Sequence, residues 1–525
     1  MNRPFRRGRR ALALGLTAFV MLAGACSSTS DSGGHAGGGA PVRGGTLTVG
    51  LQVAPKSLDP LFGNAPDLDR NVFNAFYQTL VRIEPGGKVA DVLASRHTVS
   101  ADGRTYTFTL RQGVTFGDGT PFDADAVVFN LKRVTDPANN SPRAVDLVAI
   151  DTVTATDPQT VTVTLKQPTA AFLAGLAGEA GMMVSPTAAA KGADALQRDP
   201  VGTGPFVFDG FLNGADIKAK RNPAYWEKTD DGGQLPYFDA ITFRVIPDAN
   251  VKMTDLKTGG VQLIDTVPIR QAAALASDDG YQLIEGRGVE KWMAFNTTRA
   301  PFDDVRVRQA VAYAIDRNAI SSAITNGQGS VPATLCTKTE ICYDDAVKPT
   351  ATDAAKARSL LAEAGRSSLT VTVSVINREP DNTIAQLVQA QLKEVGVTVN
   401  IQTYEREKWI NSVLAHDFDL ATLQIGVPRL DPSLAFNGSF LAESAQNWAG
   451  VNDPDLFAAV GAANAGADPT ERRADFARAQ QILLEKAYYV FFYWNTDPAG
   501  ASARLHGVTG DQSGAWNLTR AWLTS

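Results

Sequence analysis

The sequence predicts an α/β protein with a strand-rich first half and a second half in which helices and strands alternate. From Gly45 to about Ile246 the pattern is mostly of strand type, with apolar residues at every second position in Thr46–Gln52 and Thr105–Leu110. After Ala354 the pattern alternates between helix and strand. The composition, 44% hydrophobic and 20% charged over 525 residues, is that of a globular protein. At about 150 residues per unit, this length favours roughly three to four folding units.

The first half contains one clear hairpin and one clear helix. Thr152–Leu165 predicts a hairpin, because two alternating segments flank the turn residues Asp157-Pro158-Gln159. A helix is expected to begin near Asp123. The residues at helical spacing that indicate it are Ala126, Val127, Asn130 and Leu131.

The second half predicts three helices and three strands in alternation. In chain order they are a helix at Ala354–Ala364, a strand at Leu369–Ile376, a helix from Asp381 to Val395, a strand at Val397–Thr403, a helix at Glu405–Ala415 and a strand at Phe418–Ile425. Asp353 and Asp381 are the expected N-caps of the first two helices, and Gly365 and Gly396 follow their ends. This order predicts a parallel sheet with right-handed crossovers. Because ligands bind beyond the carboxyl ends of such strands, we expect ligand contacts in the loop 426–437.

Charge balance and motifs exclude several classes of function. The chain has 49 Lys and Arg against 55 Asp and Glu, a net charge of −6, and no polybasic tract beyond the N-terminus, so nucleic-acid binding is not expected. It has no G-x-S-x-G, H-E-x-x-H, G-x-x-x-x-G-K-S/T or G-x-G-x-x-G motif. We therefore predict no catalytic residue, no cofactor and no metal site, although a Ser-His-Asp arrangement could still assemble from distant residues. The four histidines are scattered: His35, His97, His416 and His506.

Residues 1–25 predict a secretory signal peptide. A basic stretch with five arginines precedes the apolar run Ala11–Ala23, which is shorter than the roughly 20 residues that span a membrane. Leu22–Cys26 resembles a bacterial lipobox, in which Cys26 would carry the lipid, although Ala23 stands where Leu is usual. A plain cleaved signal with an incidental Cys is the alternative. Arg9-Arg10 leaves twin-arginine export open beside the Sec route.

Residues 26–41 predict a lipidated Cys followed by a flexible tether. Ser27–Ala40 is rich in Ser and Gly and contains almost no apolar residue. Such a tether would let a globular body stand off a membrane.

Two further cysteines predict a disulfide. Cys336 and Cys342 lie six residues apart in a chain that is expected to be exported. A metal pair is the alternative, but no third or fourth ligand residue lies near them in the sequence.

Five groups of segments, in the order typical of the family, resemble the bacterial family 5 solute-binding proteins of ABC importers, which bind peptides, dipeptides and nickel. These groups are Phe108–Val128, Val201–Phe206 with Asn222–Trp226, Phe295–Thr297 with Pro301–Arg317, Ala354–Gly365, and Asn447–Pro454. Taken one by one, the residues in these segments are best explained by folding and not by ligand contact. Asp118–Pro121 is a turn, and the helix after Asp304 carries an ordinary buried stripe.

The resemblance implies a bilobed clamp, an α/β fold of the periplasmic-binding-protein type II, cluster C-like. The chain would cross between the lobes twice at the hinge, near Gly286–Asn296 and near Ala487–Thr496. Hinge closure around a ligand would present the closed form to an importer. The domains we expect are lobe I at 42–290 with a subdomain at about 81–195, lobe II at 291–487, and a segment at 488–525 that returns to lobe I.

The resemblance also implies the function of an extracytoplasmic solute-binding subunit, anchored to the cell membrane by an N-terminal lipid. Its partners would be an ABC permease and ATPase, and we expect a monomer. The expected ligand is an oligopeptide, with a metal chelate, an opine-like compound or a sugar derivative as alternatives. An exported hydrolase and a ligand sensor for a membrane kinase are the rival functions.

The loop after the Phe418 strand carries the first candidate ligand contacts. Peptide binders of the family have a Trp and an amine-binding Asp there, but this chain has Ile425 and Pro428 at those positions. A buried ammonium needs a carboxylate partner, so Asp431 is either a replacement anchor or an Asx turn before Pro432. Arg429 could instead favour an anionic ligand group.

Four further residues are candidate contacts. Arg143 lies in a segment that resembles a family loop bordering the cleft. Trp409, Trp448 and Trp494 could each offer a stacking face to a ligand, or pack in the core or at the rim.

Overall fold

A computed structural model describes most of the chain from Ala40 onward, and this part forms one unit. The signal peptide, Cys26 and Pro428 lie outside the described residues. Among the helices that are described, none is both long and apolar enough to cross a bilayer. The described residues are 40–63, 66–192, 194–213, 215–284, 286, 288–427, 429–442, 444, 446–466 and 468–524.

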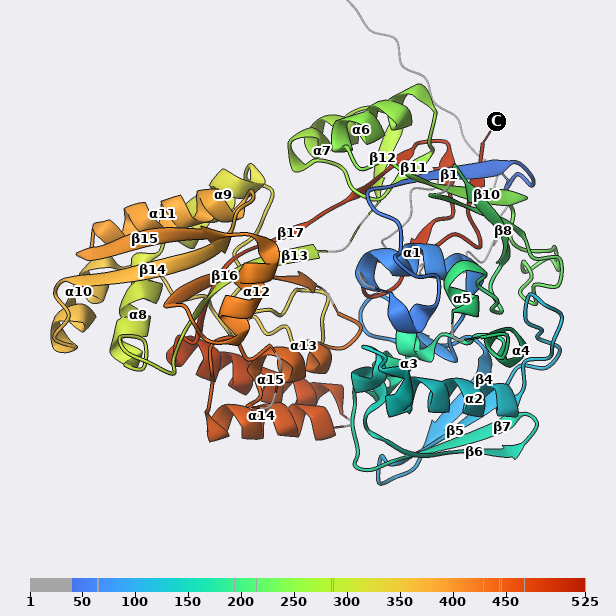
Figure 1. The fold of residues 1–525 in the computed structure, drawn as a ribbon, viewed down its shortest axis with the longest axis horizontal. Helices are drawn as coiled ribbons and strands as arrows, with labels where there is room; N and C mark the ends of the chain where they lie inside the picture. The colour runs from blue at the N-terminus through green and yellow to red at the C-terminus, as the bar shows by residue number, and fades with distance from the viewer. Residues whose placement is uncertain are drawn as a thin grey trace, which may run out of the picture. The chain divides into compact units, whose positions relative to one another are not determined.

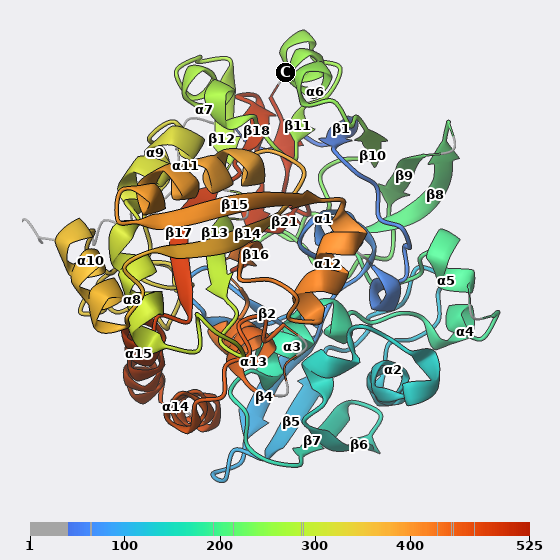
Figure 2. The same ribbon diagram turned by 60° about the vertical axis from the view of Figure 1, so that its left-hand side comes forward.

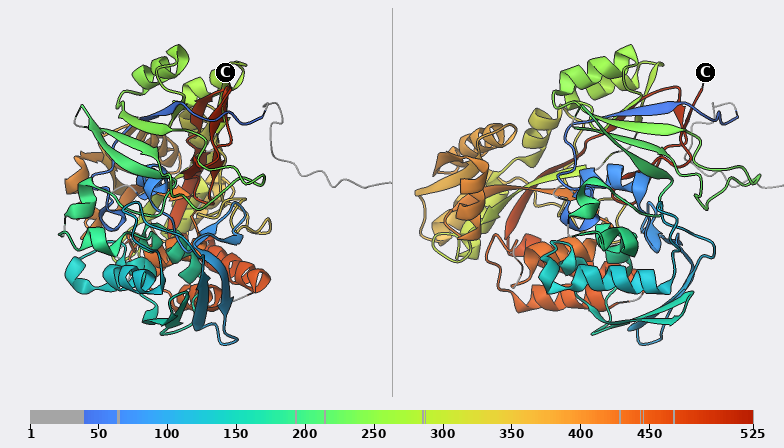
Figure 3. Two further views of the ribbon diagram at one scale, coloured as in Figure 1. Left: turned by 90° about the vertical axis from the view of Figure 1, so that its right-hand side faces the viewer. Right: turned by 45° about the vertical axis from the view of Figure 1, so that its right-hand side comes forward.

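Two groups of sheets divide the fold, as Figure 1 shows, and we call them lobe I and lobe II. Lobe I holds a seven-stranded sheet in which β1 is parallel to β10 and to β11. Figure 3 shows the C-terminal strands returning to this sheet, where β18 pairs with β11 and β12. In spatial order the strands are β12 (Tyr281–Ile284), β18 (Ala499–Ser502), β11 (Leu263–Ile264), β1 (Thr46–Leu51), β10 (Ala240–Val245), β9 (Asp216–Arg221) and β8 (Phe206–Leu212).

A smaller antiparallel sheet completes lobe I. The predicted hairpin is present as β6 and β7, and the predicted helix as α2, which begins after Asp123 with Asp123 Oδ1 accepting the Ala126 N–H at 3.0 Å. In spatial order the strands are β4 (Ala94–Val99), β5 (Thr105–Leu110), β7 (Thr160–Leu165) and β6 (Ile150–Asp157). Three two-strand ladders lie beside these sheets: β2 (Val81–Ile83) with β3 (Val89–Asp91), β19 (Leu505–His506) with β22 (Trp522–Leu523), and β20 (Thr509–Gly510) with β21 (Trp516–Asn517).

Lobe II is built on a five-stranded mixed sheet. The predicted parallel unit is confirmed, since β14 runs parallel to β15 on one side and to β16 on the other. β13 runs antiparallel to this unit, and β17, antiparallel to β13, forms the edge of the sheet. In spatial order the strands are β15 (Val397–Tyr404), β14 (Leu369–Ile376), β16 (Leu420–Val427), β13 (Gly288–Phe295) and β17 (Tyr489–Thr496).

Helices cover these sheets. The helices of lobe I are α1 (Pro66–Phe76), α2 (Ala124–Thr135), α3 (Phe172–Ala177), α4 (Pro186–Ala189), α5 (Ala195–Arg198), α6 (Ala249–Thr258) and α7 (Ile269–Ala276). Those of lobe II are α8 (Val305–Ala314), α9 (Arg317–Thr325), α10 (Ala354–Glu363), α11 (Asp381–Lys393), α12 (Arg406–Leu414), α13 (Pro432–Phe440), α14 (Pro454–Ala465) and α15 (Pro469–Glu485).

Strands β13 and β17 carry the chain between the lobes, as the fold prediction requires. They pair with each other antiparallel from Gly288 opposite Thr496 to Ala294 opposite Tyr489. Every residue of β13 is buried, and its side chains alternate between the cores on the two faces of the sheet. Just before β13 the connections touch, because a Cβ on Gly286 would lie 2.1 Å from the carbonyl oxygen of Asp497.

Three expectations from the sequence need correction. The first half contains more helix than we expected, notably α1. Its apolar residues Val72, Phe73 and Phe76 are buried at helical spacing among Asp and Asn residues of low helix propensity. Helix α11 has Pro380 at its cap position, and the Asp381 carboxylate bonds side chains elsewhere. The loop after β16 is shorter than 426–437, because α13 already begins at residue 432.

The loop between β16 and α13 reaches into lobe I. Leu430 is only 7% exposed and belongs to the core of the smaller sheet, together with Leu61 and Leu147. Hydrogen bonds also join the lobes, from Ala170 N to the Asn464 oxygen at 2.8 Å and from Gln512 Nε2 to the Thr339 oxygen at 3.2 Å. The end of β16 is therefore held by both lobes.

Replacing Phe108 with Ala should destabilise the smaller sheet of lobe I. Phe108 on β5 is fully buried in its core, so we expect the free energy of unfolding to fall by about 3–5 kcal/mol. Val99→Ala, on the neighbouring strand and 45% exposed, is the control and should change it by less than about 0.5 kcal/mol. Urea denaturation followed by circular dichroism measures both, and equal effects would contradict the assigned core.

Candidate functional site

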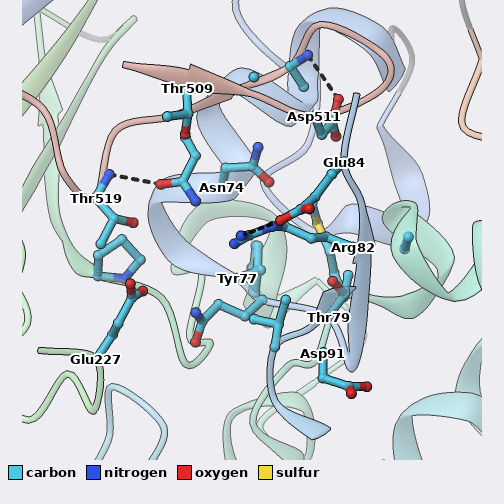
Figure 4. A pocket seen from close by; sticks show the side chains of 18 of the residues that line it. Asn74, Tyr77, Thr79, Arg82, Glu84, Asp91, Glu227, Thr509, Asp511 and Thr519 are labelled. Atoms are coloured by element: carbon cyan, nitrogen blue, oxygen red, sulfur yellow. Dashed lines mark hydrogen bonds and ion pairs between the residues drawn. The ribbon is translucent and has the colours of Figure 1, made fainter. Parts of the chain in front are cut away.

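A cavity of about 770 Å³ lies within lobe I (Figure 4). Its charged side chains have partners. Arg82 Nη2 lies 3.0 Å from Glu84 Oε1, the Arg111 guanidinium stacks 4.5 Å from the ring centre of Trp226, and Asp511 pairs with Arg70. Because these charged groups already have partners inside the protein, we do not expect this cavity to bind a charged solute strongly.

A second cavity, of about 480 Å³, lies at the carboxyl ends of β14 and β16, and we call it the switch-point cavity. Its lining residues come from β13, β14, β16, α11, α12, the loop between β14 and α11, and the segment before α14. They are Lys291, Ile376, Arg378, Asp381, Arg406, Trp409, Ile410, Val413, Leu414, Thr422, Leu423, Gln424, Gly426, Gln446 and Trp448. Figure 2 shows α12 at the end of β16.

The chain topology creates this cavity. β14 pairs with β16 only at Val373–Leu420 and Ser374–Ala421, and beyond these pairs the two strands separate. The chain leaves β14 through α11, which packs on one face of the sheet, and returns to β16 through α12, which packs on the other. Strand order therefore reverses at β14, and such a reversal leaves a crevice in which α/β proteins bind ligands.

A buried ion pair forms the floor of the switch-point cavity. Lys291 Nζ lies 2.8 Å from Asp381 Oδ1, and both side chains are 2% exposed. Asp381 also accepts hydrogen bonds from Thr422 Oγ1 at 3.0 Å and from Arg378 Nε at 2.9 Å. Burial lowers the pKa of Lys291, and the nearby Asp381 carboxylate opposes this by stabilising the ammonium.

The walls of the switch-point cavity carry more positive than negative charge. Lys291, Arg378 and Arg406 face a single carboxylate, Asp381, so the charged lining sums to about +2. The whole chain, by contrast, has a net charge of −6. This local excess of cations favours a ligand that carries an anionic group.

Two tryptophans form apolar walls of the same cavity. Trp409 on α12 is 8% exposed, and its Nε1 lies 3.4 Å from the carbonyl oxygen of Ser374. Trp448 is half-buried, and its ring stands at 72° to that of Trp292, with the ring centres 5.9 Å apart. Such rings offer flat apolar surface to a bound solute.

Asp431 lies outside this cavity and has partners of its own. It caps α13 by accepting the Ser433 N–H at 2.8 Å, which is the Asx-turn geometry. Its two carboxylate oxygens lie 2.8 and 3.0 Å from Arg472 Nη2. Arg429 lines a different cavity, of about 570 Å³, whose walls come from both lobes, and its backbone N–H donates to Glu340 Oε1.

The remaining candidates are dispersed. Arg143 precedes a short 3-10 turn in lobe I, Ala144–Leu147. Trp494 on β17 lines a cavity at the hinge and packs against the core of lobe II. Of the six candidates, only Trp409 and Trp448 share the switch-point cavity.

The cysteines and potential metal ligands are placed as follows. Cys336 and Cys342 are joined by a disulfide, with their Cα atoms 5.7 Å apart. Within the described ranges, no group of three or more His, Cys, Asp or Glu side chains could hold a metal ion.

Sequence reasoning missed the charged residues of the switch-point cavity. Arg378 follows the carboxyl end of β14, and Arg406 begins the helix after β15. Applying the carboxyl-end rule to all three parallel strands, as we did for β16 alone, would have identified both. Lys291 gave no such signal, because its partner Asp381 is 90 residues away.

Comparison with known proteins places the chain in a family. Residues 88–447 match the family described as "Bacterial extracellular solute-binding proteins, family 5 Middle". The chain belongs to the family 5 solute-binding proteins. Members of this family are the solute-binding components of ABC importers.

Relatives and solved structures support the same assignment. The glutathione-binding protein GsiB of Salmonella paratyphi A is 38% identical over 348 residues, which cover 66% of this chain and 67% of that protein. The structure of AgaA from A. tumefacien R10, in complex with agropinic acid, is 28% identical with a TM-score of 0.77 and covers 92% of this chain and 99% of that one. The structure of HbpA2 from Haemophilus parasuis is 25% identical with a TM-score of 0.80. The match covers 92% of this chain and 100% of HbpA2. This family 5 protein therefore has the expected type II clamp fold.

Replacing Asp381 with Asn should destabilise this family 5 protein, because it leaves the buried Lys291 ammonium without its carboxylate. We expect a loss of about 3–5 kcal/mol in the free energy of unfolding, measured by urea denaturation. The double variant Lys291→Met, Asp381→Asn also removes the ammonium, so its free energy of unfolding should fall by less than that of the single variant. A double variant that is as unstable as the single one would contradict the role of the ion pair.

Proposed function

We propose that this family 5 protein captures short peptides or peptide-like carboxylates in the switch-point cavity and delivers them to an ABC permease. The observation that carries the proposal is the excess of cations in a cavity at the strand-order reversal of lobe II. GsiB is named for binding glutathione, and AgaA was solved with agropinic acid. Both names are in line with a small carboxylate ligand.

The carboxylate end of the solute would bind Arg378 and Arg406. Both guanidiniums line the cavity, and Arg378 is 41% exposed, so it remains accessible to a ligand. A guanidinium binds a carboxylate with two parallel hydrogen bonds, which fixes the orientation of the ligand. Trp409 and Trp448 would pack against its apolar part.

The amino end of a peptide finds no free acid among the described lining residues. Asp381 already serves Lys291, Arg378 and Thr422, so an added ammonium would compete with three existing donors. Recognition would therefore depend on the carboxylate more than on the amine. A non-peptide carboxylate is the second candidate for this reason.

Binding would act through the hinge and not through chemistry. The two strands that join the lobes would let lobe I close over the cavity, and a solute that contacts both lobes stabilises the closed form. The closed form would then be recognised by the permease.

The protein would work on the outer side of the cell membrane, as a monomer held by a lipid on Cys26. Its lipobox-like segment and the tether that follows support this location. The tether would leave the lobes free to close.

Replacing Arg378 with Gln should weaken ligand binding about 10- to 100-fold, the worth of a charge-assisted hydrogen bond. The probes are glutathione and Ala-Ala-Ala, measured by isothermal titration calorimetry, together with any solute released from purified protein and identified by mass spectrometry. Arg366→Gln, an exposed arginine after α10, is the control and should bind as the wild type does. A released non-peptide carboxylate would favour the second candidate, and a neutral or cationic solute would overturn the proposal.

Replacing Cys26 with Ser should release the protein from the membrane fraction. A lipid on Cys26 would be lost with its thiol, whereas Ser27→Ala, the control, should leave attachment intact. Fractionation with fatty-acid labelling measures this. Labelled Cys26→Ser protein in the membrane fraction would contradict lipidation at this residue.

A further inference from the structure

We propose that Arg143 and Arg429 form a second anion subsite across the boundary between the lobes, so that the preferred solute carries two anionic groups. This inference rests on the proposed function, since it extends the ligand site from the switch-point cavity toward lobe I. It would make the substrate class an acidic peptide or a peptide-like dicarboxylate.

The loop after β16 holds Arg429 at the lobe boundary. Its neighbour Leu430 packs into a core of lobe I that also contains Leu61 and Leu147. The Arg429 backbone N–H donates to Glu340 Oε1 of lobe II at 3.0 Å. Arg429 is therefore fixed from both lobes, and its side chain lines the cavity between them.

A well-anchored turn of lobe I holds Arg143 near the same place. The Arg143 N–H donates to Ser141 Oγ at 3.1 Å, and Ser141 Oγ donates to the Leu61 oxygen at 3.1 Å. The turn continues to Leu147, which shares a core with Leu430. The two arginines thus come from opposite lobes, and both lie close enough to Asp146 to act on its charge.

Both guanidiniums contain a buried nitrogen that lacks a partner. Among the described residues, Nε of Arg143 and Nε of Arg429 are shielded from water and make no hydrogen bond. Buried charged donors without acceptors are rare because their desolvation is costly. An anionic group of a ligand would supply the missing acceptor.

Asp146 is the acid that both arginines face. Burial raises the pKa of its carboxyl to about 6, and the nearby Arg143 and Arg429 oppose this. Glu179 and Arg70 also act on Asp146, but they pair with each other at 3.0 Å. Above pH 6 the Asp146 carboxylate competes with a ligand anion for the two arginines, and below pH 6 it loses its charge.

The two anion sites border the same short stretch of chain after β16. Gly426 lines the switch-point cavity, and Arg429 follows three residues later. Three residues of extended chain span at most about 10 Å, so the Cα atoms of Gly426 and Arg429 are separated by no more than about the length of an extended tripeptide. A solute with a carboxylate at each end would bind both.

The test uses glutathione, which has two carboxylates, and Ala-Ala-Ala, which has one, in calorimetric titrations at pH 7.5 and pH 5.5. Arg143→Gln and Arg429→Gln should each weaken glutathione binding about tenfold or more, and the control Arg366→Gln should not. Asp146→Asn should strengthen glutathione binding at pH 7.5 but have little effect at pH 5.5, where Asp146 is largely protonated. The surface control Asp151→Asn should have no effect at either pH.

The outcomes separate this inference from the proposed function. Wild-type protein that binds neither probe overturns the inference, and a neutral or cationic solute released from the purified protein overturns the proposed function as well. Ala-Ala-Ala bound as tightly as glutathione overturns the inference alone. The inference alone is also overturned if Arg378→Gln weakens glutathione binding but Arg143→Gln and Arg429→Gln leave it unchanged. A gain of affinity in Asp146→Asn supports a role in binding, because damage to the fold would lower affinity.

Discussion

The pairing of β13 with β17 is the interaction on which the rest of the structure depends. These strands are the connection between the lobes, and they are also adjacent strands of the lobe II sheet, with β17 at its edge. β13 supplies core residues to both faces of the sheet and, at Lys291, the ammonium on the floor of the switch-point cavity. The hinge, the core of lobe II and the candidate site therefore share these two strands. A change in how the strands pair would alter all three.

Local signals explain how much of the fold was predictable. β14, β15 and the helices after them have clear periods, and capping residues or glycines mark their ends, so their bounds agree with the structure to within about two residues. α1 was missed because Asp and Asn weaken its helical pattern, and burial of Phe73 and Phe76 overrides that weakness. The position of the cavity followed from strand order. The ion pair between Lys291 and Asp381 did not, because only the folded sheet brings these residues together.

Composition concealed the charge of the candidate site. The chain as a whole is acidic, but Arg378, Arg406 and Lys291 line one cavity that contains a single carboxylate. Asp431 fits the family's motif, but its carboxylate already pairs with Arg472 and caps the start of α13. A motif match therefore does not show which side chain is available to a ligand, because it carries no information on the partner that a residue finds in the fold.

The contact between Gly286 and Asp497 lies at the hinge, just before β13 and just after β17. Two backbone connections touch there, with no room for a side chain on Gly286. A side chain at position 286 would meet the Asp497 carbonyl, so any residue larger than glycine there would have to push the two connections apart. Because both connections belong to the hinge, we expect such a substitution to alter the angle at which the lobes meet.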